Sequence, residues 1–305
     1  MITIEQVIER IPEWQGKALA VSPLVGGLTN RNYKVEVDGA PYVVRIPGAS
    51  TELLAVDRIN ELHNTRAAAR AGVGADVLHH LPDWNVMVLS FLPGETMSSA
   101  RLNEPGMPVH IARALSQLHA APRFLHDFDM FRTLAIYRET MQKRDMPAPE
   151  GFDALLPEVE RIREALVPVA TVPCHNDLLA ENYLFDGQRL RIVDYEYSGN
   201  NDPCFELGNT CQEQQYGEEQ IQELCAAYFG EAYSDKLARM KLHMVMSDVG
   251  WSLWAAISAR ISTLDFDFWG WAVERKERAA AKVFGPDFAG WLRDASRQWS
   301  NSTHL

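Results

Sequence analysis

Three polar residues in one stretch of the chain could together transfer a phosphoryl group. The run His175-x-Asp177-x-x-x-x-Asn182 is followed, twelve residues later, by Asp194. Asp177 could accept the proton of an acceptor hydroxyl, and oxygens of Asn182 and Asp194 are the hard ligands that Mg²⁺ prefers. A chance match to the first three residues is expected in about one chain in a hundred of this length. The spacing therefore predicts a catalytic loop containing His175, with Asp177 as general base.

Other interpretations of these residues are weaker. Singly, Asp177 and Asn182 could each cap a helix and Asp194 could form a turn, but all three occur together around a predicted hairpin. Cys174 beside His175 does not indicate a cysteine hydrolase, because neighbouring residues of an extended loop point in different directions. The chain also has no G-x-S-x-G elbow for a serine nucleophile.

A glycine pair and a lone arginine in the first part of the chain could contact a nucleotide. Gly26 and Gly27 lack side chains, so backbone N–H groups near them can approach phosphates; an ordinary hairpin turn is the alternative. Arg45 is the charged residue of the apolar strand 42–46 and needs an anionic partner, for which Glu61 is the candidate. The alternatives are an exposed strand residue and a solvated helix face.

Two different parts of the chain must position these residues. Over 18–90 the periodicity is that of strands, and Asp38-Gly39 between 33–37 and 42–46 predicts a two-residue hairpin in an antiparallel sheet. Ser50 is expected to cap a helix that runs to about Ala71. Two short strands, 77–81 and 85–90, are expected to follow.

Helical patterns dominate the remainder, at 109–120, 131–143, 152–166 and several places between 206 and 299. A second hairpin, with strands at 183–185 and 189–193 around Asp186-Gly187, interrupts them directly after the polar run 175–182. The sequence therefore predicts an α+β protein of two lobes. Residues 1–92 would form a small antiparallel-sheet lobe for the nucleotide, and 93–305 a larger, mainly helical lobe for catalysis and substrate.

Composition narrows the partners and the location. The 305 residues carry a net charge of −12, which disfavours nucleic acid and anionic membranes and suits a small cationic ligand. The four cysteines lack zinc-site spacing and are expected to be reduced thiols. The chain begins without a secretory signal pattern, and its apolar stretch 244–261 contains Asp248 and Arg260. We therefore expect a cytoplasmic protein without membrane insertion; nothing in the sequence indicates its oligomeric state.

Nearly the whole chain resembles the choline/ethanolamine kinase branch of the aminoglycoside-phosphotransferase-like proteins, which have a protein-kinase-like fold. The resemblance rests on 26–33, 42–48 and the catalytic loop. It is most specific in Asp194-Tyr-Glu-Tyr-Ser198 followed by Glu206-Leu-Gly-Asn209 and Glu213. The segments 251–254 and 265–271 resemble the substrate region of that branch.

This resemblance implies ATP-dependent phosphorylation of a small amino alcohol, choline first and ethanolamine second, by direct in-line transfer. It implies that Asp177 is the base, that Asn182 and Asp194 bind Mg²⁺, and that Glu61 orients Arg45 toward the phosphates. It also implies a terminal-phosphate site at Thr29 and Asn30, an adenine site at Ser90 to Leu92, and a choline pocket lined by Glu213, Trp251, Trp254 and Trp271.

The aromatic pocket has independent physical support. A quaternary ammonium donates no hydrogen bond and is best held by aromatic faces near a carboxylate. Trp251 and Trp254 are three residues apart, on one face of a predicted helix. A tryptophan stripe at this spacing is also typical of a helix core.

Two other functions stay open. A kinase of the same fold could phosphorylate an aminoglycoside or another amino sugar, for which a pocket rich in exposed acids would be expected. A non-catalytic nucleotide or amine sensor is the second, although the complete set of Asp177, Asn182 and Asp194 argues against it. Compared with eukaryotic members of the resembled branch, Leu179 replaces a polar residue and Trp271 a tyrosine, and Tyr216 is the nearest tyrosine after Glu213. These departures bear on the identity of the amino alcohol.

Overall fold

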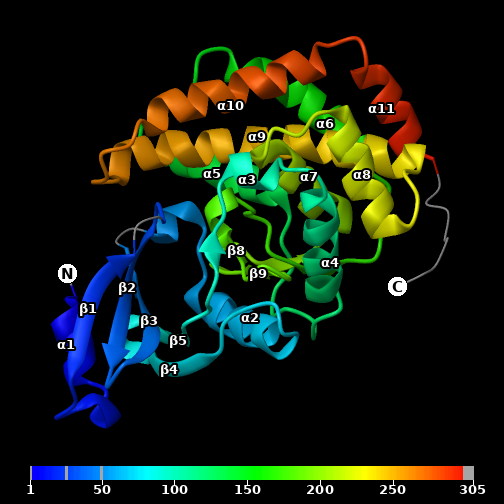
Figure 1. Cartoon of the computed structure of the whole chain (residues 1–305). Coiled ribbons are helices and arrows are strands. Elements are labelled where there is room, and N and C mark those ends of the chain that lie inside the picture. The colour runs from blue at the N-terminus through cyan, green and yellow to red at the C-terminus, as the bar shows by residue number, and fades with distance from the viewer. Residues whose placement is uncertain (1, 25–26, 49–50, 298–305) are drawn as a thin grey trace.

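The smaller lobe is built on a five-stranded antiparallel sheet. The computed structural model describes residues 2–24, 27–48 and 51–297 (Figure 1). The strands lie in the order β1-β2-β3-β5-β4, with bounds β1 Leu19–Leu24, β2 Asn30–Val37, β3 Ala40–Pro47, β4 Val77–Leu81 and β5 Val86–Ser90. The predicted hairpin is confirmed, because Val37 pairs with Ala40 and the two residues between them have the positive φ angles (50° and 85°) that a two-residue turn requires.

One face of this sheet forms a core and the other faces the larger lobe. The helices α1 (Ile4–Glu9) and η1 (Pro12–Trp14) pack on the first face, against Val44 and Ile46 of β3 among others. Side chains alternate along a strand, so Arg45, which lies between Val44 and Ile46, points to the face opposite theirs. Strand alternation thus directs the lone cation of β3 toward the helical lobe.

The helix expected from Ser50 to Ala71 is wrong in its first part. Ser50 lies outside the described residues, and Thr51–Leu54 form a separate 3₁₀ turn, η2. Ala55 then has a φ of 61°, which a helix does not accommodate. The helix α2 spans Arg58–Arg70 and begins at Asp57, whose carboxylate accepts the N–H groups of the second and third residues after it. Glu61 is therefore in the first turn of α2.

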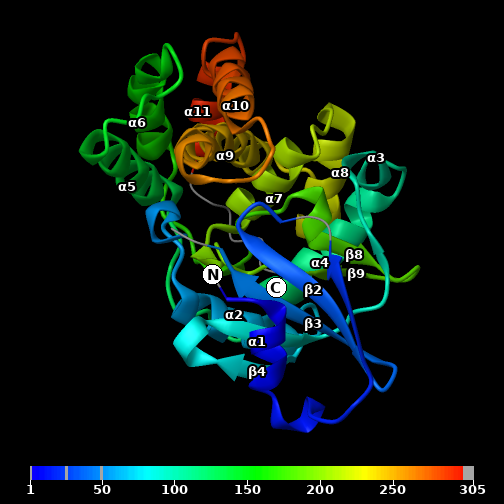
Figure 2. The same ribbon diagram turned by 90° about the vertical axis from the view of Figure 1, so that its left-hand side faces the viewer.

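The larger lobe is organised around the 28-residue helix α9 (Ser234–Ile261), which is buried along most of its length. Figure 2 shows α5 to one side of α9, α7 to the other and α10 above it. The bounds of the helices around α9 are α3 Ser99–Leu102, α4 Met107–His119, α5 Met130–Lys143, α6 Leu156–Ala165, α7 Pro203–Glu213, α8 Glu218–Phe229, α10 Phe268–Val283 and α11 Phe288–Ala295. The predicted helices at 109–120 and 131–143 are confirmed as α4 and α5, whereas 152–166 divides into η4 (Phe152–Leu155) and α6.

Short strands on the side of this lobe that faces the sheet carry the polar run. β7 (Val172–Cys174) pairs with β10 (Gly199–Asn201), and β6 (Glu95–Thr96) pairs with β8 (Tyr183–Phe185), which forms a hairpin with β9 (Leu190–Ile192). The hairpin is confirmed, although its loop spans 186–189 because Phe185 pairs with Leu190. The α+β architecture of two lobes is as predicted, while the boundary at residue 92 stays a prediction. Among the described residues, no helix is long and apolar enough to cross a membrane.

Candidate active site

Helix α7 fixes the backbone of the loop that follows β7. The buried carboxylate of Glu206 accepts the N–H groups of His175 and Asn176, both at 2.8 Å. The side-chain oxygen of Asn209, one turn later, accepts the N–H of Leu178 at 2.8 Å. Burial raises the pKa of Glu206 to about 7 despite these donors. Sequence analysis gave Glu206 no role, although its acidic side chain in an otherwise buried helix was a usable signal.

His175 connects this loop to the segment after β9. Its Nε2 donates to the carbonyl oxygen of Val193 at 2.9 Å, and its Nδ1 accepts the N–H of Asp177 at 3.3 Å. Burial lowers the pKa of His175 to about 4, so the ring is neutral near pH 7. The predicted catalytic histidine is not among the described residues that line the cavities of the site; its contacts position Asp177 and the residue after Val193.

Asp177 and Asn182 lie side by side. The Nδ2 of Asn182 donates to the backbone oxygen of Asp177 at 2.8 Å, so Oδ1 is the atom of Asn182 available to a cation. Burial, Glu213, Asp194 and Glu196 raise the pKa of the Asp177 carboxyl, and Arg275 acts in the opposite direction. The carboxylate of Asp177 thus lies in an acidic, poorly hydrated environment.

Arg45 binds three carboxylates, one from α2 and two from the segment after β9. One of its terminal nitrogens lies 2.5 Å from Asp194, 3.0 Å from Glu61 and 3.4 Å from Glu196. The predicted pairing of Arg45 with Glu61 is therefore confirmed. Burial by itself lowers the pKa of Arg45, but the three carboxylates outweigh it and the pKa is raised. Asp194 has a φ of 73°, a strained value for a residue with a side chain, which is common at functional sites.

Glu196 is a central residue that sequence analysis did not assign. Its carboxylate accepts a hydrogen bond from the hydroxyl of Thr29, another from Nδ2 of Asn30 at 2.9 Å, and a third from Arg58 at 3.2 Å. Burial and the neighbouring Asp194 raise its pKa to about 7. The signal was its position two residues after Asp194, inside the segment 194–198 that carries the most specific part of the family resemblance. Thr29 and Asn30, predicted near terminal phosphates, here contact Glu196.

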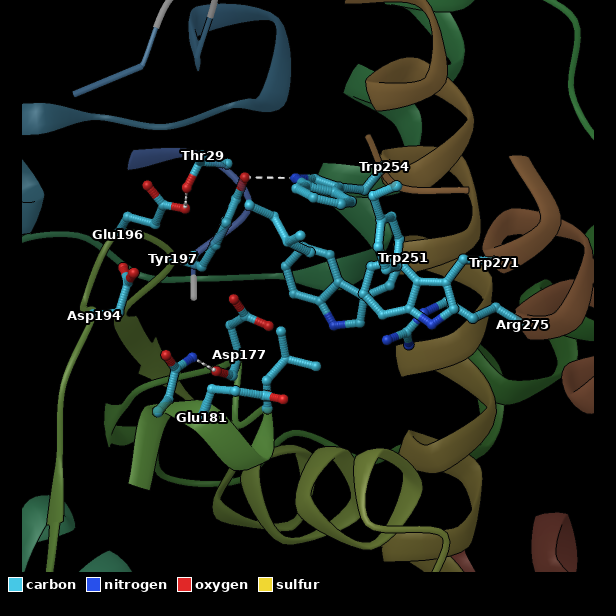
Figure 3. A pocket seen from close by; sticks show the side chains of 15 residues that line it. Thr29, Asp177, Glu181, Asp194, Glu196, Tyr197, Trp251, Trp254, Trp271 and Arg275 are labelled. Atoms are coloured by element: carbon cyan, nitrogen blue, oxygen red, sulfur yellow. Dashed lines mark hydrogen bonds between the residues drawn. The ribbon is translucent and has the colours of Figure 1, made fainter. Parts of the chain in front are cut away.

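Two cavities meet in the cleft between the lobes. The aromatic cavity, about 320 Å³, lies against α9 and α10, and the sheet-side cavity, about 230 Å³, lies under β3 and β5. Gly27, Glu181, Asn182 and Asp194 line both. The two predicted metal ligands are therefore at the junction. Asp177 lines the aromatic cavity only, on the side where Figure 3 places it below Tyr197.

Most of the predicted binding residues line the expected cavity. The sheet-side cavity is lined by Arg45, Ser90 and Leu92, and the aromatic cavity by Trp251, Trp254 and Trp271. Thr29, predicted on the nucleotide side, lines the aromatic cavity instead. Asn30 and Glu61 are not among the described residues that line either one, and Gly26 lies outside the described part of the chain.

Aromatic rings form the wall of the aromatic cavity opposite Asp177. The Nε1 of Trp254 donates to the hydroxyl of Tyr197 at 2.6 Å (Figure 3). The rings of Tyr197 and Trp251 have centroids 5.0 Å apart, and those of Trp254 and Trp271 are perpendicular at 6.1 Å. Phe266 completes this wall. Such a concave set of rings can hold an organic cation.

Glu213 does not have the expected place in this wall. It is absent from the described residues that line the aromatic cavity, because Arg275 binds both of its carboxylate oxygens, at 2.8 and 2.7 Å. Arg275 itself lines the cavity. Sequence analysis missed it, although its place four residues after Trp271 on one helix was a signal. Tyr216, the other candidate, donates to the backbone oxygen of Leu102 instead.

The site has one cavity under a sheet and a second cavity with a candidate base, and oxygen donors for a metal ion lie where the two meet. This arrangement is that of a phosphotransferase of protein-kinase-like fold. Residues 20–243 match the phosphotransferase enzyme family. The chain belongs to this family and, within it, to the choline/ethanolamine kinase family.

Three similar proteins support this assignment. A choline/ethanolamine kinase family protein from Mesorhizobium loti is 33% identical, with a TM-score of 0.84 over 95% of this chain and 97% of that one. LicA of Haemophilus influenzae is 28% identical over 244 residues, 76% of this chain and 72% of LicA. Mouse ethanolamine kinase 1 is 26% identical over 310 residues, 87% of this chain and 84% of that one. The predicted fold and the prediction of a small-molecule kinase are confirmed.

Proposed function

We propose that this enzyme transfers the γ-phosphoryl group of ATP directly to the hydroxyl of a small amino alcohol, choline in preference to ethanolamine. The observation that carries the proposal is the junction of the two cavities. An acceptor in the aromatic cavity and a nucleotide in the sheet-side cavity would both reach Asn182 and Asp194, with Asp177 on the acceptor side. The reaction is expected in the cytoplasm.

On the acceptor side, the rings of Trp251, Trp254 and Trp271 would bind the cationic group, which has no hydrogen bond to donate in choline. Asp177 would then accept the hydroxyl proton as the oxygen attacks phosphorus. The contact of Asn182 with the backbone of Asp177 and the neutral His175 would keep this carboxylate in place.

On the nucleotide side, the backbone from Ser90 to Leu92 would contact adenine, and Arg45 would face the phosphates. Oxygens of Asn182 and Asp194 would hold Mg²⁺, which neutralises charge on the phosphate oxygens. The chemistry of these donors fits the ion. Thr29 and Asn30 would approach the terminal phosphates.

An amino sugar is a weaker candidate for the acceptor. Such acceptors favour many exposed carboxylates, whereas five aromatic residues line the aromatic cavity and, of its acidic residues, Glu181 is the exposed one.

The test is a phosphotransfer screen with Mg²⁺-ATP and choline, ethanolamine or a panel of amino sugars, with Asp177→Asn as the blank. We expect phosphocholine as the main product and phosphoethanolamine at lower kcat/KM. Phosphorylation of amino sugars alone, or no acceptor-dependent use of ATP, would refute the proposal.

A further inference from the structure

Arg275 is the one cation among the described residues that line the aromatic cavity. Its side chain is 1% exposed, and its guanidinium carbon lies 4.1 Å from the ring centroid of Trp271. Trp271 precedes it by one helical turn on α10. A guanidinium at this distance from an indole makes a cation–π contact. One face of Trp271 therefore already carries a cation.

The carboxylates that neutralise Arg275 lie behind the cavity wall. Glu213 binds it through both oxygens, and Asp248, which is fully buried, lies 3.5 Å away. Asp248 also accepts two hydrogen bonds from Arg278, at 2.5 and 3.2 Å. Two arginines thus balance two carboxylates in a cluster of low exposure. Arg275 neutralises the charge of Glu213 inside this cluster. The group of the cluster that faces the cavity is the guanidinium of Arg275.

The guanidinium of Arg275 would repel a substrate ammonium at one end of the cavity. The face of Trp271 next to Arg275 is occupied, and a second cation there would lie beside a like charge. Trp251, Trp254 and Tyr197 are further aromatic residues of this wall, across the cavity from Asp177 (Figure 3). The ammonium is thereby directed away from α10.

We propose that Arg275 is a substrate-positioning residue, which fills the cation site at Trp271 and neutralises Glu213 so that the acceptor binds with its hydroxyl at Asp177. This inference rests on the proposed function for the identity of the acceptor. Removing the guanidinium would free the face of Trp271 and leave Glu213 as a buried, unpaired carboxylate beside it. An ammonium would then bind there, in an orientation that does not react.

The test uses Arg275→Gln and tetramethylammonium, a cation without a hydroxyl, whose affinity is measured by calorimetry. We expect Arg275→Gln to bind tetramethylammonium about tenfold more tightly than the wild type, as expected for one cation–π contact and one carboxylate. With choline, kcat and KM should both fall by a similar factor, because unproductive binding lowers both.

Arg278→Gln is the matched control. Arg278 is on the same helix and binds the same Asp248, but it is not among the described residues that line the aromatic cavity. Its substitution should change tetramethylammonium affinity less than twofold. The double variant Glu213→Gln/Arg275→Gln lacks the unpaired carboxylate, so its affinity should return toward that of the wild type.

Thermal melting shows whether each variant is folded. If Arg275→Gln does not fold, Arg275→Lys keeps a charge for Glu213 but lacks the planar group over Trp271, and its affinity should shift in the same direction by a smaller factor. Unchanged or weaker binding of tetramethylammonium by the folded variant overturns the inference. A fall in kcat with unchanged or higher KM also overturns it. Failure of the wild type to phosphorylate choline and ethanolamine would instead count against the proposed function, because tetramethylammonium affinity does not depend on turnover.

Discussion

Two buried arginines, Arg45 and Arg275, each bind carboxylates at the cleft, but they differ in whether a carboxylate of the cluster also lines a cavity. Arg45 collects three carboxylates, one of which, Asp194, remains partly exposed and lines both cavities. Arg275 collects Glu213 and Asp248, which are buried, and is itself on the cavity wall. In a cluster of this kind, the member that faces the ligand sets the chemistry. The Arg45 cluster therefore offers both a cation and the oxygens of Asp194, whereas the Arg275 cluster offers the aromatic cavity a cation alone, which restricts where another cation binds.

The largest expected effect comes from removing the acid that the Arg45 cluster presents to the cavities. Asp194→Ala, like Asp177→Asn, should lower kcat at least a hundredfold, because positioned bases and metal ions each contribute effects of about this size. Steady-state assays over a range of Mg²⁺ concentrations check this. Asp186→Asn, in the exposed loop between β8 and β9, is the control and should leave kcat nearly unchanged. Retention of most Mg²⁺-dependent activity by Asp194→Ala would contradict the assignment.

Substitution of Arg45 in the same cluster should lower mainly the stability of the fold. Arg45→Gln removes the cation of Asp194 and leaves Glu61 and Glu196 with Arg58 alone, and we expect a loss of about 3–5 kcal/mol in the free energy of unfolding. Arg45→Lys keeps the charge and should lose less stability, while kcat/KM for ATP falls about tenfold because a lysine cannot reproduce the planar donor set. Urea unfolding and ATP kinetics of both variants test this. Equal stability of Arg45→Gln and wild type would show that the cluster does not depend on Arg45.

The corresponding change in the other cluster should be smaller. Glu213→Gln removes a carboxylate that does not line the aromatic cavity, so we expect KM for choline to rise about threefold, through a more positive Arg275. Initial-rate kinetics at saturating ATP measure this change. A rise of a hundredfold or more with an intact fold would mean that Glu213 binds the ammonium directly.

Substitution of His119, a buried base outside both clusters, should leave activity unchanged and should have a small effect on stability at acidic pH. Burial lowers the pKa of His119 from 6.5 to about 3, although Asp202 acts in the opposite direction. The unfolded chain therefore binds a proton near pH 6.5 that the folded chain excludes, and stability is lost as the pH falls below 6.5. Between pH 7 and 5 the loss from this group is about 2 kcal/mol.

Denaturant unfolding of His119→Gln at pH 7 and pH 5 tests this assignment. The variant should lose about 2 kcal/mol less than the wild type over the same interval. An identical loss in both proteins would assign the acid sensitivity to other groups.

Local signals carried much of the fold and the centre of the site. Asp38-Gly39 and Asp186-Gly187 predicted both hairpins, and Asp38, Gly39 and Gly187 have the left-handed backbone that tight turns need. The spacing of Asp177, Asn182 and Asp194 located the junction of the two cavities. What a local pattern cannot contain is the identity of distant partners. The contact of Thr29 with Glu196 spans 167 residues. Next to the break at Ala55, the backbone oxygen of Leu54 likewise accepts a hydrogen bond from Tyr137, 83 residues away.

Glu213 shows the same limit in the substrate region. Residue type and resemblance indicated an acid for the ammonium, but the partner that neutralises it, Arg275, is 62 residues away on another helix. Which charged side chain is buried and which one faces the cavity can be determined only from the three-dimensional structure. The roles of the individual site residues accordingly remain predictions for mutagenesis.

The measurement that tests the central claim most directly is the stereochemical course at phosphorus, determined with ATP made chiral at the γ-phosphoryl group by oxygen isotopes and with choline as acceptor. Direct in-line transfer between the two cavities inverts the configuration in phosphocholine. Retention, which requires a phosphoenzyme intermediate and two displacements, would contradict the account.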